Sequence, residues 1–156
     1  MQNQHDYFRR EENHDPTKAD RKLPDPTVCP DCGATYLNGR WSWEEAPAEA
    51  ARHRCSACER TRTNYPAGHV TVRGRFAREH RDEILRTARN TEAREKAEHP
   101  VNRIMHTTED EDQLVIQTTD LHLAPAIGKA LQHAFHGKLR IDYEEDIVRV
   151  DWSRDE

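Results

Sequence analysis

Residues 27–43, TVCPDCGATYLNGRWSW, contain a Cys-x-x-Cys pair, Cys29 and Cys32, followed at once by a glycine. A second pair, Cys55 and Cys58, comes 22 residues later. Two such pairs at this spacing are typical of a four-cysteine zinc ribbon, in which each pair turns tightly and its two thiolates meet one ion. The sequence therefore predicts zinc bound by Cys29, Cys32, Cys55 and Cys58, with a single iron ion as the chemical alternative.

The predicted metal has a structural role. Cysteines fill all four positions of the tetrahedron, so none is left for water or a substrate. A redox pair would normally lie alone near a βαβ unit, and structural disulfides would suit a secreted chain; the sequence offers neither context. The N-terminal stretch has no apolar leader segment, and the chain has no run of 18 apolar residues. We therefore expect a reducing, cytoplasmic location without membrane insertion.

The chain is poor in aliphatic and aromatic core formers. Leu, Ile, Val and Phe together account for 24 of the 156 residues. A chain of this composition forms a single apolar core only with difficulty and commonly depends on a metal or a partner. The composition thus agrees with a fold that zinc helps to hold together.

Charge is distributed unevenly along the chain. The net charge is −5, but residues 52–100 carry 12 basic and 7 acidic side chains, against 6 and 10 in residues 1–51 and 6 and 12 in residues 101–156. Eleven of the twelve basic residues in the middle block are arginines, whose planar fork suits phosphate groups and stacks on bases. A cationic block inside an acidic protein indicates a polyanionic partner.

The patterns predict an α+β protein of four parts. Residues 1–27 are polar and read as a flexible tail. Residues 28–74 form the zinc ribbon, with Asn38-Gly39 at a hairpin turn. Residues 75–100 form an Arg-rich linker helix with no Gly or Pro between Arg75 and His99, packed at its start, solvated at its end and stopped near Pro100. Residues 101–156 form an acidic ββαββ module, a sheet with one helix packed on it.

Catalytic patterns are absent from the sequence. None of the three serines lies in a nucleophile elbow, and no Gly-rich phosphate loop is present. His133 and His136 are suitably spaced to bind a metal, but no neighbouring carboxylate or cysteine completes a site. We therefore expect a non-enzymatic protein with no catalytic residues.

The cationic block and its aromatic neighbours predict an RNA-binding surface. RNA is favoured over DNA because no helix-turn-helix or finger pattern is present. In the alternative interpretation, the aromatic residues form the small core of the ribbon and the arginines pair with acids. The acidic module would repel phosphate and contact a protein instead. The candidates are Arg54, Arg60, Arg62, Arg73, Arg75 and Arg78 for phosphate contacts, and Trp41 and Trp43 for stacking on bases.

Several stretches of the chain together support a family resemblance. CPDCGATYLNGRWSW, PAGHVTVRGRFAREHRDEIL, EHPVNRI, TTDLHLAPAIGKALQHAFHGKLRIDY and VRVDW, between residues 28 and 153, resemble a poorly characterised bacterial family of short zinc-ribbon proteins. The order of a Cys-x-x-Cys ribbon followed by TTDLHLAPAIGKAL is more distantly similar to the export adaptor of the large ribosomal subunit in eukaryotes and its archaeal relatives.

The resemblance implies a ribosome-facing protein whose ribbon contacts ribosomal RNA. In a bacterium this role would be subunit maturation, quality control or dormancy under stress, including ribosome hibernation. A rival interpretation is a regulatory factor that senses zinc or thiol oxidation and binds a protein partner through the Arg-rich helix. The first interpretation predicts RNA affinity; the second predicts reversible zinc release by oxidant without RNA affinity.

Overall fold

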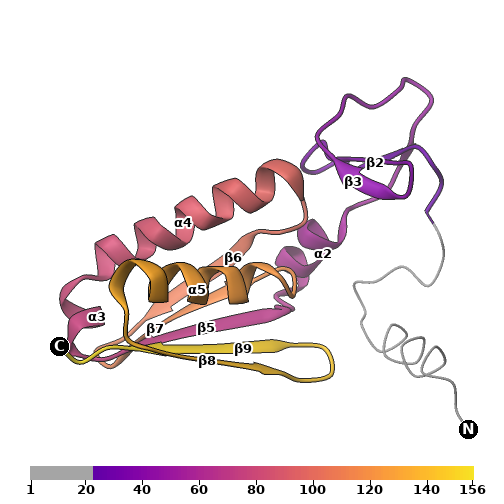
Figure 1. Cartoon of the computed structure of the whole chain (residues 1–156). Coiled ribbons are helices and arrows are strands. Elements are labelled where there is room, and N and C mark those ends of the chain that lie inside the picture. The colour runs from indigo at the N-terminus through magenta and orange to yellow at the C-terminus, as the bar shows by residue number, and fades with distance from the viewer. Residues whose placement is uncertain (1–22) are drawn as a thin grey trace, which may run out of the picture.

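The computed structural model describes residues 23–156, which form a mixed α+β protein with four helices and two sheets (Figure 1). The smaller sheet has the strand order β3-β2-β1-β4 and belongs to the ribbon that carries the four cysteines. The larger sheet has the order β6-β7-β5-β9-β8. Residues 1–22, most of the expected tail, lie outside the described residues.

The ribbon is built from four short strands and helix α2. A hairpin joins β2 and β3, and Asn38 and Gly39 at its turn have φ angles of 54° and 81°. These are the positive values that a two-residue turn of this kind requires, so the predicted hairpin is confirmed. The bounds are Thr27–Val28 for β1, Thr35–Leu37 for β2, Arg40–Ser42 for β3, Ala51–Arg52 for β4 and Ser56–Thr63 for α2.

The ribbon begins earlier than expected. Thr27 is fully buried and pairs with Tyr36 in the small sheet. The carboxylate of Asp25 accepts hydrogen bonds from the backbone N–H groups of Asn38 and Gly39, both at 3.2 Å. The described end of the predicted tail, residues 23–27, therefore belongs to the ribbon, because Thr27 pairs in its sheet and Asp25 bonds to its hairpin turn.

The ribbon also ends earlier than expected, because its predicted last strand lies in the other sheet. Strand β5, Gly68–Arg73, is the central strand of the five-stranded sheet, antiparallel to β7 and parallel to β9. The sheet is therefore not built from residues 101–156 alone, as the expected ββαββ module would be. The remaining strands are β6 (Ile104–Glu109), β7 (Gln113–Thr118), β8 (Lys138–Tyr143) and β9 (Val148–Ser153).

Helices α4 (Arg81–Glu98) and α5 (Leu123–Phe135) lie side by side on one face of this sheet (Figure 1). The predicted linker helix is therefore a packed layer of the fold, with Ile84, Ala88 and Thr91 buried. It is also interrupted at His80, which separates the short α3 (Arg75–Glu79) from α4. Only the last two turns of α4 lack buried residues, which agrees with the predicted loss of packing toward its end.

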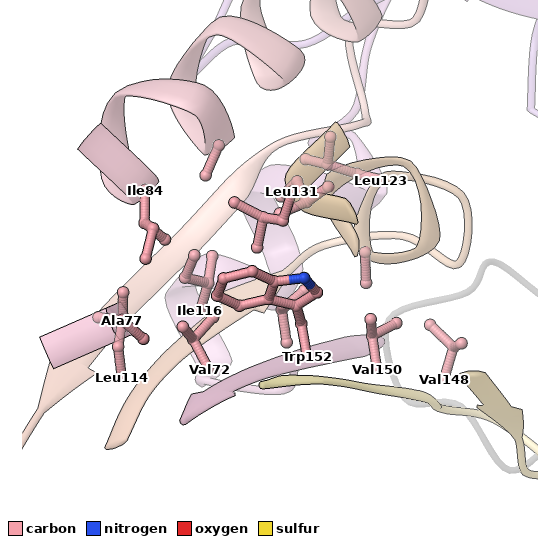
Figure 2. Close-up of a cluster of buried hydrophobic side chains, with 14 residues drawn as sticks. Val72, Ala77, Ile84, Leu114, Ile116, Leu123, Leu131, Val148, Val150 and Trp152 are labelled. Atoms are coloured by element: carbon pink, nitrogen blue, oxygen red, sulfur yellow. The ribbon is translucent and has the colours of Figure 1, made fainter. Parts of the chain in front are cut away.

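Trp152 lies at the centre of the apolar core between helices and sheet (Figure 2). Its side chain is 1% exposed, and its indole N–H donates to the carbonyl of His136 at 2.6 Å. Alternate residues of β5, β7 and β9 face the helices, as the period of two in a strand requires. The surrounding buried aliphatic side chains are Val70, Val72, Ile84, Leu114, Ile116, Leu123, Ile127, Leu131, Val148 and Val150.

Among the helices of residues 23–156, none combines the length and the apolar character needed to cross a bilayer.

Candidate metal centre

The four predicted cysteines meet at one point. Their Sγ atoms all lie within 4.8 Å of one another, and those of Cys32 and Cys55 are 3.8 Å apart. None of the four forms a disulfide. In a tetrahedron with metal–sulfur bonds of about 2.3 Å, neighbouring sulfurs lie about 3.8 Å apart. The cluster therefore fits a metal ion with four thiolate ligands.

The first pair of cysteines lies in a tight turn. The N–H of Gly33 donates to the carbonyl of Cys29 at 3.0 Å, and the N–H of Cys29 donates to the carbonyl of Ala34 at 2.8 Å. Gly33 has a φ of 81°, a value that other residues adopt only with strain. The glycine that follows the first pair is thus required by the backbone conformation.

The second pair needs no such glycine because it begins a helix. Cys55 is the N-cap of α2, and its Sγ accepts a hydrogen bond from the N–H of Cys58 at 3.4 Å. The N–H of Cys55 in turn donates to the Sγ of Cys29 at 3.3 Å. The exposed N–H groups at a helix N-terminus favour negative charge, so α2 stabilises the thiolates next to it.

Burial and hydrogen bonding act differently on the individual thiols. Burial alone would raise the pKa of Cys29, but hydrogen bonds from the backbone N–H groups of Cys55, Cys32 and Asp31 outweigh it and lower the pKa to about 7. Burial raises the pKa of Cys55 and of Cys58, and the positive charge of Arg103 partly opposes this. Cys29 is thus the most readily ionised of these three thiols.

Arg103 joins the cysteine cluster to the five-stranded sheet. Its Nη2 donates to the Sγ atoms of Cys32 at 3.0 Å and Cys55 at 3.5 Å, and its Nη1 donates to the Sγ of Cys58 at 3.3 Å. Burial opposes its charge, but the hydrogen bonds and charges of these cysteines outweigh burial and raise its pKa above the usual value. A dication with four thiolates carries a charge of −2, of which the guanidinium balances half.

The backbone around Arg103 is fixed by the end of β7. The Oγ1 of Thr119 accepts from the N–H of Arg103 at 3.0 Å and donates to the carbonyl of Val101 at 2.6 Å. Arg103 also donates from its Nε to the carbonyl of Pro100 at 2.6 Å, and Val101 packs against the ribbon core. The next residue after Thr119, Asp120, accepts from the N–H groups that open α5. The sequence TTD at 118–120 thus positions both Arg103 and α5.

Three of the arginines predicted to contact RNA are engaged within the ribbon. Arg54 bonds to the carboxylates of Asp31 and Glu59, and Arg62 bonds to Glu59. These two arginines hold the pKa of Glu59 down at about 2. Arg60 is buried, donates to the carbonyl of Tyr65 at 3.0 Å and lies 5.2 Å from the centre of its ring.

The other three predicted arginines lie at the opposite end of the fold. Arg73 donates to the side chain of Gln113 at 3.1 Å, and Arg75 forms an ion pair with Glu79 at 3.3 Å. Arg78 is exposed and pairs with no acidic side chain in residues 23–156. The structure therefore does not bring the six arginines together into one surface.

The two predicted stacking residues differ in their environment. Trp41 is half-buried against the ribbon core, with its ring 5.5 Å from that of Tyr36. Trp43 is 41% exposed, and its indole N–H donates to the carbonyl of Lys96 in α4 at 2.6 Å. Trp43 is thus open on one side while it ties the ribbon hairpin to α4.

Arg103 is the functional residue that the sequence alone did not indicate. It lies 45 to 71 residues from its cysteine partners and within a segment expected to be an acidic module. The structure places it directly before β6, which begins at Ile104.

Comparison of the chain with models of protein families, with curated proteins and with solved structures gives no match. The resemblance described from the sequence stays a prediction.

Proposed function

We propose that the chain is a non-enzymatic zinc protein that binds RNA, with the ribosome as the RNA partner. Zinc is the metal that four converging thiolates favour, and a site filled by cysteine leaves no open position for catalysis. The proposal of a ribosomal partner follows the sequence resemblance to the subunit export adaptor.

A stripe of exposed cations along α4 carries the RNA part of the proposal. Arg86, Arg89 and Lys96 share one side of the helix by their spacing and are exposed. None of the three pairs with an acidic side chain within residues 23–156. Cations that are not used inside the fold are available for phosphates, unlike Arg54 and Arg62. We call Arg86, Arg89 and Lys96 the α4 stripe.

The test is sedimentation of the zinc-loaded protein with ribosomes at low and moderate salt. We expect migration with a subunit or the whole ribosome that weakens as salt rises, because phosphate contacts release counterions. An Arg86→Gln/Arg89→Gln variant should bind more weakly and show a smaller salt dependence, whereas Arg75→Gln, whose arginine pairs with Glu79, should behave as wild type. Protein that stays at the top of the gradient in both salts would refute the proposal.

A second candidate function is supported by the exposure of two ligands. Cys32 and Cys58 are only half-buried, so an oxidant can reach them, and both bond to Arg103. Peroxide would oxidise two of the thiolates to a disulfide while being reduced to water, which would release zinc and break the contact between the ribbon and the five-stranded sheet. A regulatory factor of this kind would release zinc reversibly with mild peroxide and would have no affinity for RNA.

A further inference from the structure

Two hollows flank the ribbon hairpin where it meets the C-terminal end of α4. The larger has a volume of about 730 Å³ and lies between the hairpin, residues 98–102 and the first turns of α5. The smaller, of about 580 Å³, lies between β3 and the last residues of α4. Arg40, Glu98 and His99 line both hollows, which therefore adjoin. We call the pair the hairpin groove.

Exposed aromatic rings gather at this groove. Within residues 23–156, the large apolar side chains that stay exposed are Trp43, Leu121 and Tyr143, the last at 69%. Tyr143 lines the larger hollow together with Trp41, and Trp43 lines the smaller one. Exposed apolar rings around a hollow commonly mark a binding site, and flat rings suit ligands with a flat apolar face.

The polar lining of the groove is mixed in charge. Arg40 and Lys129 are exposed cations, while Glu98 and Glu95 supply carboxylates. Asn102 is buried and donates from its side chain to Glu95 at 3.3 Å. A purely cationic groove would suit any polyanion equally well. This groove also has carboxylates, which can accept hydrogen bonds from the amino groups of a ligand. Nucleobases combine a stacking face with amino and carbonyl groups at their edges.

The groove continues from the α4 stripe. Lys96, the last cation of the stripe, accepts the hydrogen bond of Trp43 through its carbonyl, and the next residues of α4 line the smaller hollow. We propose that the hairpin groove holds unstacked bases of single-stranded RNA, with Trp43 and Tyr143 as stacking platforms. Arg40 and Lys129 contact the adjoining phosphates. This inference rests on the proposed function and names the part of the surface that contacts bases.

The experiment measures binding of a fluorescein-labelled eight-nucleotide oligoadenylate to the zinc-loaded full chain by fluorescence anisotropy. Tyr143→Ala should weaken binding about fivefold or more, the effect expected for loss of one stacking contact. Tyr143→Phe keeps the aromatic ring, so its affinity should stay within about twofold of wild type, a smaller change than the loss of one stacking contact would cause. Arg140→Ala, on the same strand but outside the groove, is the matched control and should also retain affinity. Trp43→Ala should weaken binding in the same way as Tyr143→Ala.

Each outcome decides the inference. If wild type binds the oligonucleotide and both alanine variants retain full affinity, the groove does not hold bases, and the α4 stripe stays a candidate for the RNA contact. Displacement of the oligonucleotide by polyglutamate as effectively as by unlabelled oligoadenylate would also overturn it, because it would indicate generic polyanion binding. If wild type binds no RNA at all, the proposed function fails and the groove assignment fails with it.

Discussion

Replacing Arg103 by methionine tests whether this residue stabilises the metal centre. Methionine keeps much of the volume of the side chain but removes the charge and all hydrogen bonds to Cys32, Cys55 and Cys58. Residues that bond to metal ligands typically contribute a factor of about 10 to 100 in metal affinity. That range corresponds to about 1.4 to 2.7 kcal/mol. We expect Arg103→Met to fall within it, because two nitrogens of one guanidinium serve three sulfurs.

The assay is competition for zinc between the protein and a colorimetric chelator at fixed pH, with unfolding of the zinc-saturated protein measured in parallel. Arg103→Lys should lie between wild type and Arg103→Met, because an ammonium keeps the charge but lacks the planar fork. Arg81→Met is the matched control, since Arg81 is partly buried and pairs with Glu109. A folded Arg103→Met protein that binds zinc within twofold of wild type would refute the assigned role.

Three further predictions concern the metal and the packing. Cys55→Ser should abolish zinc binding and remove the chemical-shift dispersion of the ribbon amides in NMR spectra, while the amide signals of the five-stranded sheet stay dispersed. A well-dispersed ribbon spectrum without zinc would contradict this. Gly128→Ala should destabilise the protein by about 1–3 kcal/mol in urea unfolding, because the new Cβ would lie 2.6 Å from Val150 Cγ1. The cost of this clash exceeds the gain in helix propensity from alanine. Asp120→Ala should cost about 1 kcal/mol, because the carboxylate accepts from the N–H groups of His122 and Leu123, and Asp120→Asn should cost less. Burial raises the pKa of Asp120 in the folded protein, so the folded state binds a proton more readily than the unfolded state. The stability of wild type relative to Asp120→Asn should therefore rise as the pH falls through this raised pKa.

The parts of the fold that follow from local rules could be predicted. The spacing of the cysteines gives the ligand set, and Asn38-Gly39 gives the hairpin, because each depends on a few neighbouring residues. The helix and strands after residue 100 can be predicted for the same reason. Pro125 lies in the first turn of α5, where its missing N–H is not needed.

The parts that depend on distant pairing could not be predicted. The alternation in β5 shows that it is a strand, but the same pattern would suit either sheet, and only pairing with β7 and β9 assigns it. The apolar face of α4, with Ile84 and Ala88, is too small to predict a core helix from the sequence. It is buried because α5, a distant element in the sequence, packs beside it. By contrast, the ion pairs of Arg62 with Glu59 and of Arg75 with Glu79 can be predicted from the sequence, because the partners lie three and four residues apart on a helix.

The contacts between the ribbon and the rest of the fold link zinc binding to the proposed RNA site. The apolar core of the ribbon consists of two buried cysteines and two buried alanines. A core this small rarely holds a fold by itself, so we expect the ribbon to depend on a metal bound by its cysteines. The sulfurs hold Arg103, Val101 packs on the ribbon core, and Trp43 bonds to α4. Loss of zinc would release all three contacts and remove the wall of the groove that carries Trp41 and Trp43. The α4 stripe and Tyr143 lie outside the ribbon. Zinc removal should therefore lower RNA affinity by the contribution of Trp43 without abolishing it. The binding that remains should depend strongly on salt, because the proposed phosphate contacts of the stripe are kept.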